Sequence, residues 1–341
     1  MFIPIIKPSV KRSDMDSVLT CMVSDNLGPG IISERLVKDV SEYLGVEGGV
    51  ALREYRRAIA LAMEALGLAK GSKVILSPLC PRVYRDVCIE KEIEILFVDV
   101  EPETGCLSTE QIDNYDGQEI GAIIVHANLG FASNMEALTE YQVPIIEDIS
   151  QALGANTGVK RLGSYGNYII VSMEPECIIT SGGGVLLLGK GKKETGVLKR
   201  LTESYLPELF LPDFNAALGI TQIKTVERFI ERRKEIAQIF SRAIMQSRHK
   251  ILIQKGEGDN IYYSFPIIID SGMKDVQAYA RKKGIETKPA FNGTIIAFLP
   301  EEEKKWPSAA SLYLRCLLFP LYPTLTKPGI GQIEKVLSTL P

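Results

Sequence analysis

Two polar side chains lie at the end of the apolar segment VPIIEDI (143–149) and just after it, where a strand would end. Asp148 lies near the end of this segment and Gln151 stands three residues further on. Open α/β sheets bind ligands at the carboxyl ends of their strands, so a carboxylate here can hold a positively charged group of a bound molecule. Asp also commonly caps the helix that follows a strand, by accepting hydrogen bonds from backbone N–H groups. Both interpretations of Asp148 stay open from the residues alone.

A second segment, SMEPECIITSGGG (172–184), combines two carboxylates and a thiol with a run of glycines. Cys177 would act as a nucleophile only if its surroundings lowered the pKa of its thiol, and neither of the two histidines lies in this segment. A free cysteine is more often a small buried side chain, which is the favoured interpretation. Glu174 and Glu176 would form an acid–base pair only if different surroundings separated their pKa values.

Arginines gather in two short stretches, REYRR (53–57) and PRVYR (81–85). Guanidinium groups bind phosphates and carboxylates through paired hydrogen bonds, so one hypothesis is a pocket for an anionic ligand. The other is that these side chains lie on solvated helix faces and pair with Glu54, Asp86 and Glu90, and this second interpretation is favoured because clusters of charge alone say little. The arginines concerned are Arg53, Arg56, Arg57, Arg82 and Arg85.

The segments that must position these residues alternate between strand and helix patterns from about residue 33 onward. Their strand-like runs are almost continuously apolar, which is typical of parallel strands covered on both faces. Amphipathic stretches such as RRAIALAMEALGLAKG (56–71) lie between them. This rhythm predicts an α/β fold, with a mixed, mostly parallel sheet covered by helices. The expected strands lie within 73–78, 93–100, 122–128, 143–149, 168–173 and 183–189.

A long amphipathic helix is predicted over 215–246, where apolar positions recur every three or four residues beneath a highly charged face. Beyond it, a strand within 260–270 and helices near 274–284 and 329–339 indicate a small C-terminal α+β domain. The length of 341 residues also suggests about two domains. We therefore expect a large domain over 1–240 and a small one over 241–341, joined by the long helix.

Composition narrows the function classes. Hydrophobic residues make up 45% of the chain and charged residues 24%, as in ordinary globular proteins. No apolar run approaches the ~18 residues of a membrane span, and the N-terminus lacks the features of a signal peptide. The net charge is −3 and the basic residues are scattered, which argues against nucleic-acid binding. Six cysteines without a CxxC pair, and only two histidines, favour free thiols over a metal site. We expect a cytoplasmic protein without a metal, a nucleic-acid partner or a membrane anchor.

Taken in order, segments along nearly the whole chain resemble the DegT/DnrJ/StrS family of nucleotide-sugar aminotransferases. The blocks are IPIIKPSV (3–10), NLGPG (26–30), FVDVEPETGCLSTEQI (97–112), VPIIEDISQALGA (143–155), RLGSYG (161–166), NAALGITQIKTVERFIERR (215–233) and FPLYPTLT (319–326). The resemblance implies the type I fold of enzymes that depend on pyridoxal phosphate (PLP). It also implies a homodimer with its active site at the subunit interface.

The resemblance assigns cofactor-binding roles to several of these residues. Asp148 falls where the family places the carboxylate partner of the pyridinium nitrogen, and Gln151 matches a glutamine near the ring oxygen of PLP. Ser172 matches a serine that precedes the Schiff-base lysine by five residues. Counting forward from Ser172 places Cys177 at the lysine position, whereas counting back from the glycines places Glu176 there. Neither side chain can form an imine. One branch of the family uses histidine there, but this segment contains none.

The phosphate-binding loop also departs from the family pattern. Family members have a Ser-Gly-Thr run at a helix N-terminus, where free N–H groups hold the phosphate. The matching stretch here is REYR (53–56), so Tyr55 replaces the glycine and is followed by Arg56. The remaining family contacts, a ring-stacking aromatic and an Asn-x-Arg from the partner chain, fall at Arg82, Glu208 and Phe210.

Three functions remain in play. The first is a family member without transaminase activity and without bound PLP, which binds a nucleotide sugar or another anionic small molecule, or partners an active relative. The second is an aminotransferase or dehydratase that holds PLP or pyridoxamine phosphate (PMP) noncovalently through Asp148. The third is a dimeric scaffold with a purely structural role. The absence of the lysine favours the first.

Overall fold

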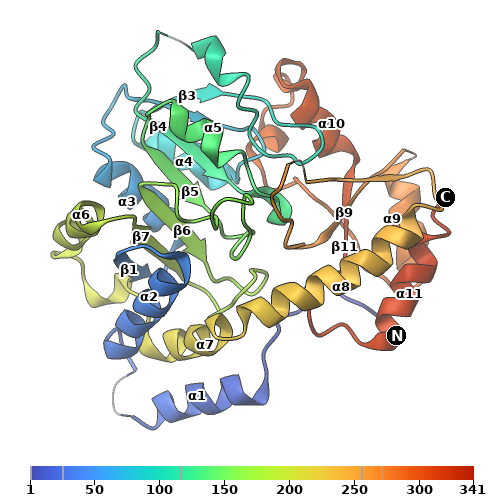
Figure 1. Ribbon diagram of the computed structural model, residues 1–341, viewed down its shortest axis with the longest axis horizontal. Coiled ribbons are helices and arrows are strands. Elements are labelled where there is room, and N and C mark those ends of the chain that lie inside the picture. The colour runs from blue at the N-terminus through green and yellow to red at the C-terminus, as the bar shows by residue number, and fades with distance from the viewer. Residues whose placement is uncertain (1, 25–26, 116, 255, 271) are drawn as a thin grey trace.

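A seven-stranded sheet forms the centre of the larger part of the molecule (Figure 1). The structure is a computed structural model that describes residues 2–24, 27–115, 117–254, 256–270 and 272–341. The strand order is β1-β7-β6-β5-β4-β2-β3. The strands are β1 Gly48–Leu52, β2 Lys73–Leu76, β3 Glu94–Phe97, β4 Ala122–His126, β5 Ile145–Asp148, β6 Tyr168–Ser172 and β7 Val185–Gly189.

The mixed, mostly parallel character of the sheet is confirmed. Strands β3, β2, β4, β5 and β6 are parallel neighbours, whereas β7 and β1 run antiparallel at one end. All six predicted strands are present, and their limits differ from the expected ones by at most three residues. Strand β1 was not predicted, because its sequence GGVAL begins with two glycines, which are poor strand formers.

Helices cover both faces of this sheet. Apolar side chains of α2 (Ile31–Leu44), α5 (Met135–Glu140) and α7 (Asp213–Ile223) form one core with alternate strand residues. Those of α3 (Tyr55–Ala65), α4 (Arg82–Glu90) and α6 (Lys192–Thr202) form a second core on the opposite face. Short 3-10 helices occupy Ile112–Tyr115, Asn128–Gly130, Pro207–Leu209, Ile295–Phe298 and Glu303–Lys305.

The prediction of one long helix over 215–246 is wrong in one respect, because the structure has two helices there. Helix α7 ends at Ile223 and α8 (Val226–Ile244) starts after a short break. Thr225 leaves the helical conformation with ψ near 3°, and its Oγ1 donates to the carbonyl of Gln222 at 3.1 Å. Such side-chain bonds compete with the backbone pattern of a helix. The break lets α7 pack on α2 and α1 (Arg12–Met22), while α8 extends to the second sheet (Figure 1).

The C-terminal part contains a four-stranded antiparallel sheet in the order β10-β11-β9-β8. Its strands are β8 Lys250–Ile251, β9 Phe265–Ile268, β10 Lys288–Pro289 and β11 Cys316–Phe319, and its helices are α9 Met273–Lys282, α10 Pro307–Arg315 and α11 Lys327–Leu337. The predicted strand and both predicted helices are therefore present. Ile3 and residues 236–244 of α8 join this sheet's core, so the domain boundary at residue 240 stays a prediction.

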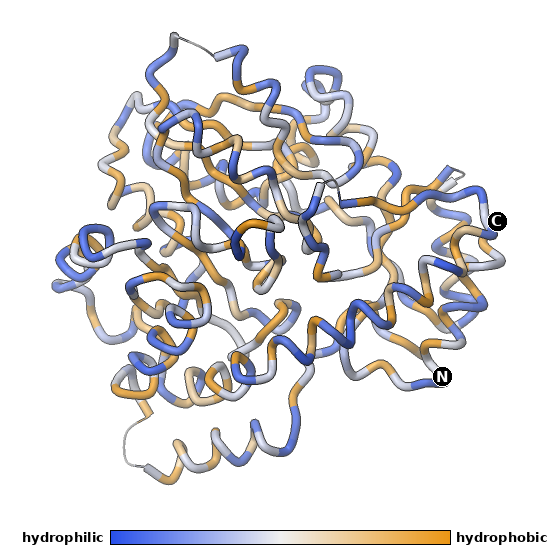
Figure 2. The backbone as a smooth tube through the Cα atoms, in the orientation of Figure 1, coloured by the Kyte–Doolittle hydropathy of each residue, from blue (hydrophilic) through white to orange (hydrophobic). Residues whose placement is uncertain are grey.

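Hydropathy follows this layering. Apolar residues run along the strands, whereas polar and apolar residues alternate along α8 (Figure 2). Within the described ranges, no helix is both long enough and apolar enough to cross a membrane.

Candidate functional site

Asp148 lies at the carboxyl edge of the large sheet, between two neighbouring parallel strands. It ends β5, directly opposite His126, the last residue of β4, and beside β6, which ends at Ser172. The side chain of Asp148 is fully buried. The sequence predicted a carboxylate at the carboxyl edge of the sheet, where open α/β sheets bind ligands, and the fold places Asp148 at this edge.

Five donors or potential donors surround the carboxylate of Asp148. Oδ2 accepts hydrogen bonds from the hydroxyls of Tyr84, at 2.8 Å, and Tyr55, and lies 2.9 Å from Nδ1 of His126. Oδ1 accepts from the hydroxyl of Ser150 at 2.5 Å and from its backbone N–H at 3.0 Å. A carboxylate offers about four lone-pair sites, so Asp148 is saturated by groups of its own chain.

These contacts stabilise the ionised form of Asp148. Burial alone would raise the pKa of this carboxyl group, but His126 and the hydroxyls of Ser150 and Tyr55 outweigh burial and lower the pKa to about 2. Burial, and then the charge of Asp148, raise the pKa of both tyrosines well above the ordinary value. The two phenols therefore stay protonated at neutral pH and act as hydrogen-bond donors.

Tyr55 and Tyr84 fill the space in front of this carboxylate. Tyr55 is the first residue of α3, and Tyr84 belongs to the first turn of α4. Their hydroxyls lie 3.5 Å apart and their rings meet edge to face, with centroids 6.1 Å apart. Tyr84 is fully buried. Arg82, which falls at the expected ring-stacking position, instead lies over Phe298, 4.2 Å from the ring centroid.

Three members of this cluster, Tyr84, His126 and Ser150, were not identified from the sequence. His126 ends the predicted strand next to the one that ends at Asp148, and parallel neighbours bring their carboxyl ends together. The positions of the two predicted strand ends could therefore have identified His126 as a neighbour of Asp148. Ser150 lies two residues after Asp148, close enough for a local side-chain bond. Tyr84 gave no clear signal, because only the orientation of α4 aims it at the carboxylate.

The segment after β6 brings Cys177 near this cluster. Burial raises the pKa of its thiol to about 12, with the charges of Glu176 and Asp148 adding to the effect. The thiol is therefore protonated at neutral pH, which favours the structural interpretation over the nucleophile. Ser172 connects the segment to the cluster, since its N–H donates to the hydroxyl of Ser150 at 2.9 Å. Burial, and then Glu176, raise the pKa of Glu174.

Gln151 lies beside a small cavity rather than against Asp148. Its Oε1 accepts a hydrogen bond from the N–H of Leu129 at 2.8 Å. Together with Glu176 and Cys177, it lines a cavity of ≈90 Å³ between the two sheets. Lys7, Lys288 and the buried Arg233 line the same cavity.

Arg56, Arg57 and Arg82 lie on α3 and α4, whereas Arg53 precedes α3 and its Nε donates to the Phe210 carbonyl at 3.2 Å. Arg56 forms an ion pair with Glu90, and Arg82 pairs with Asp86 at 3.4 Å. Arg57 lies over the ring of Tyr205, 4.5 Å from its centroid. The structure therefore does not bring Arg56 to Asp148, because α3 directs this side chain toward α4. It agrees with the interpretation that these arginines are solvated.

A comparison with known proteins assigns the chain to a family. Residues 8–340 match the model of the DegT/DnrJ/EryC1/StrS aminotransferase family. The chain belongs to this family. Among relatives of the DegT/DnrJ/EryC1/StrS type, GDP-perosamine synthase from Vibrio cholerae is 21% identical, over 97% of each chain.

Solved structures show that the fold is the type I fold expected from the sequence. The aminotransferase TlmJ from Streptoalloteichus hindustanus superposes with a TM-score of 0.89 at 19% identity, covering 99% of this chain and 98% of its own. The GDP-4-keto-6-deoxy-D-mannose-3-dehydratase from E. coli gives 0.88 at 18% identity, covering 99% and 100%. That structure holds hydrated PLP, and PLP is the cofactor that the family implies.

The residues around Asp148 do not fit PLP in this arrangement. A pyridinium N–H would need a free oxygen of Asp148, but both oxygens already accept hydrogen bonds from the chain. The ring would have to displace the half-buried Tyr55 or the fully buried Tyr84. Cys177, at the lysine position counted from Ser172, has no amine with which to form an imine.

Proposed function

We propose that this chain is a member of the sugar aminotransferase family that does not catalyse transamination. It forms a cytoplasmic homodimer and binds a nucleotide sugar or a similar anionic small molecule without PLP, alone or beside an active relative. The observation that carries this proposal is the closure of Asp148 by Tyr55 and Tyr84.

The closure explains how the fold persists without a cofactor. A buried carboxylate left unpaired costs several kcal/mol, roughly 3–5 where a buried pair loses one partner. In this chain His126, Ser150 and the two tyrosines supply the partners. The site is therefore complete as an internal hydrogen-bond network, which supports a role that uses no cofactor.

The cavity beside Cys177 supports a ligand with negative charge. Lys7 and Lys288 provide two ammonium groups, and Arg233 provides a guanidinium whose Nε has no hydrogen-bond partner among the described residues. The cavity of ≈90 Å³ is smaller than the ~300–1,000 Å³ of typical ligand sites, so we expect it to hold one end of the ligand. The names of relatives such as GDP-perosamine synthase favour a sugar nucleotide.

The alternative, a noncovalently held PLP or PMP on Asp148, is disfavoured by the same geometry. Its pyridine ring would need the space that Tyr55 and Tyr84 fill. A structural scaffold has no specific observation in its favour.

Calorimetric titration with GDP-mannose and with UDP-N-acetylglucosamine tests the binding proposal. We expect one of the two to bind the wild-type protein without added PLP. Replacing Lys7 and Lys288 by Ala should weaken this binding about tenfold, because two phosphate-facing charges are lost. Lys274→Ala, an exposed change on α9, is the control. Steady transamination between glutamate and a keto-sugar nucleotide would overturn the proposal.

A further inference from the structure

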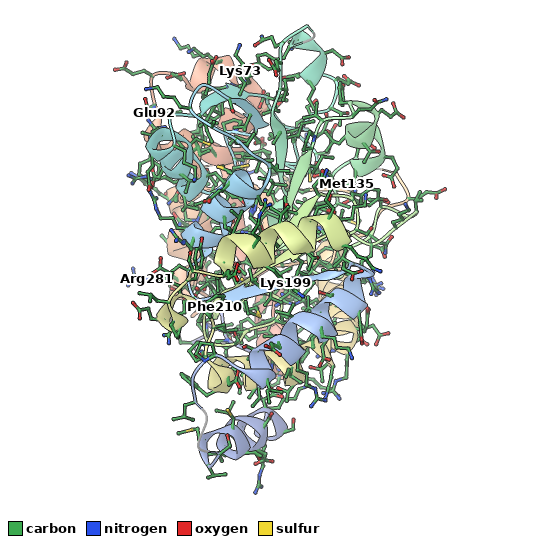
Figure 3. The ribbon with its side chains drawn as sticks, turned by 90° about the vertical axis from the view of Figure 1, so that its left-hand side faces the viewer. Lys73, Glu92, Met135, Lys199, Phe210 and Arg281 are labelled. Carbon is green, nitrogen blue, oxygen red and sulfur yellow. The ribbon has the colours of Figure 1, made fainter. Side chains whose placement is uncertain are left out.

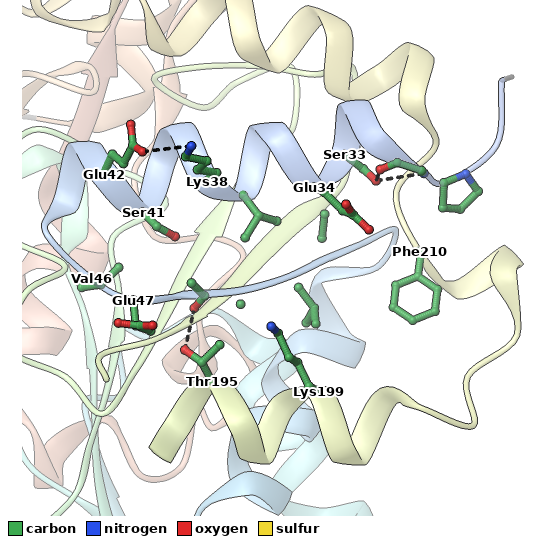
Figure 4. A pocket seen from close by; sticks show the side chains of 17 residues that line it. Ser33, Glu34, Lys38, Ser41, Glu42, Val46, Glu47, Thr195, Lys199 and Phe210 are labelled. Carbon is green, nitrogen blue, oxygen red and sulfur yellow. Dashed lines mark hydrogen bonds and ion pairs between the residues drawn. The ribbon is translucent and has the colours of Figure 1, made fainter. Parts of the chain in front are cut away.

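A groove of ≈790 Å³ lies on the side of the large sheet, away from the Asp148 cluster (Figure 4). Strand β1 runs along its floor, and helices α2 and α6 form its two walls. Figure 3 looks onto this side of the molecule. The volume falls within the ~300–1,000 Å³ of typical binding sites, unlike the cavity beside Cys177.

The floor of the groove is a sheet edge with free hydrogen-bonding positions. Strand β1 is the last strand of the sheet; it pairs with β7 along its length, and its last residue, Leu52, also bridges Phe210 on the outer edge. At its carboxyl end, the outer edge is already used, since Leu211 N–H donates to the Ala51 carbonyl and Arg53 N–H to the Leu209 carbonyl, each at 3.0 Å. Alternation along a strand then directs the N–H and C=O of Gly49, and the N–H of Ala51, toward the groove.

The buried part of the α2 wall consists of small side chains, whereas Glu34, Lys38 and Glu42 line its exposed part. Val37 is 9% exposed and Ser41 is 3% exposed, and both line the groove. The hydroxyl of Ser41 has no hydrogen-bond partner among the described residues, although burial without a partner costs free energy. Figure 4 shows this hydroxyl on the side of α2 that faces β1. An occupant of the groove would supply the missing partner.

Charge differs between the two walls. On the α2 side, Glu34 and Glu42 line the groove, and Lys38 pairs with Glu42 at 3.7 Å, whereas Glu47, just before β1, lies beside Thr195 of α6 (Figure 4). On the α6 side, the ammonium group of Lys199 points into the groove (Figure 4) and forms no ion pair with a described residue. An anionic side chain is therefore favoured next to Lys199 and disfavoured next to α2 and Glu47.

We propose that this groove binds an extended segment of a partner protein as an added strand beside β1. Exposed sheet edges recognise peptide backbones through main-chain hydrogen bonds, while alternate side chains contact the two walls. Side chains facing α2 would be small and apolar, to fit Val37 and Ser41, and those facing α6 would carry carboxylates, to pair with Lys199. The partner segment thus alternates apolar and acidic residues.

Two blocked, fluorescein-labelled pentapeptides test this proposal by fluorescence anisotropy. Val-Glu-Val-Glu-Val should bind the full chain saturably, and Val-Lys-Val-Lys-Val should bind more weakly. Amide hydrogen exchange should slow at Gly49 and Ala51 when the acidic peptide is added, which locates it on the β1 edge. A Val-Glu-Val-Glu-Val peptide with alternate N-methylated amides should not bind, because it cannot pair with a strand.

Two surface variants separate charge recognition from general effects. Lys199→Glu should weaken binding of the acidic peptide about five- to tenfold, because it replaces an attraction by a repulsion. Lys193→Glu, on the same helix but outside the groove, should leave binding unchanged. Three results would overturn the proposal: no saturable binding, equal binding of the N-methylated peptide, or exchange protection elsewhere. Equal binding of the N-methylated peptide would indicate recognition of side chains without strand pairing.

Discussion

The phenol of Tyr84 donates a 2.8 Å hydrogen bond to Oδ2 of Asp148, and both side chains are fully buried. Tyr84 reaches from helix α4 to Asp148, the last residue of strand β5, at the carboxyl edge of the sheet. The bond places a protonated phenol hydroxyl against the carboxylate that, by the family resemblance, would pair with the pyridinium nitrogen of PLP. The chain thus satisfies with its own side chains a charge that a cofactor would otherwise satisfy.

Replacing Tyr84 by Phe should destabilise the fold. The change removes one donor from a buried carboxylate and keeps the ring, so we expect a loss of about 1–3 kcal/mol in the free energy of unfolding. Urea denaturation measures it. Tyr279→Phe, whose hydroxyl contacts Thr339 at the surface, should cost less than about 0.5 kcal/mol. Equal stability of Tyr84→Phe and the wild type would show that the bond contributes nothing.

Acid should weaken the contribution of Asp148 to the free energy of unfolding. Its pKa is about 2 in the folded chain, against about 3.9 when unfolded. Because the pKa of Asp148 is lower in the folded chain, its ionised form stabilises the fold fully at pH values above the unfolded pKa. This stabilisation is lost as pH falls through the folded pKa. The contribution is about 2–3 kcal/mol.

The stability difference between wild type and Asp148→Asn should therefore narrow as pH falls from about 5 to about 2. Chemical denaturation across this range measures it, with exposed Asp16→Asn as the control for general acid effects. A difference that stays constant with pH would contradict the low pKa.

Cys177 should react slowly with iodoacetamide at neutral pH. Its thiol pKa of about 12 leaves almost no thiolate there, and thiolate is the reacting form. Peptide mass spectrometry of the native protein should find Cys177 unmodified near pH 7 and increasingly modified above about pH 10. Cys177→Ser identifies the peptide. Fast modification at neutral pH would instead reopen the nucleophile interpretation.

The homodimer implied by the family resemblance should be visible in solution. Light scattering should give twice the chain mass of 37.6 kDa at micromolar concentration. An apolar surface near α1 is a candidate contact, since Leu19, Val23 and Ile31 are 57%, 83% and 82% exposed. Changing Leu19 and Val23 to Glu should favour the monomer, whereas Val159→Glu, at a lone exposed residue, should not. A monomeric wild type would contradict the prediction.

The sequence predicted the six core strands well, because buried parallel strands are short apolar runs with clear ends. It missed β1, whose glycines carry no strand signal, and the break near Thr225, which depends on a single side-chain bond. These failures have local causes. The sequence analysis also made no prediction for the short strands β8, β10 and β11 or for helices α1 and α10.

The site was predictable only in part. Asp148 was found because its place at a strand end and the family pattern coincide. Tyr84 was not, because its role depends on the orientation of α4 relative to β5, which no local pattern encodes. Arg56 was assigned by its position after Tyr55, yet a helix turns successive side chains by about 100°, and it contacts Glu90 instead.

Titration of the purified chain with PLP tests the central claim most directly. Absorbance, borohydride reduction and mass spectrometry together detect both bound cofactor and any lysine adduct. The positive control is the variant Cys177→Lys with Tyr55→Gly and Tyr84→Ala, which restores the amine and opens the space before Asp148. We predict that wild type and Cys177→Lys alone show no aldimine band and no adduct, whereas the triple variant gains both. A PLP adduct on any lysine of the wild-type protein, with turnover of glutamate, would contradict the account.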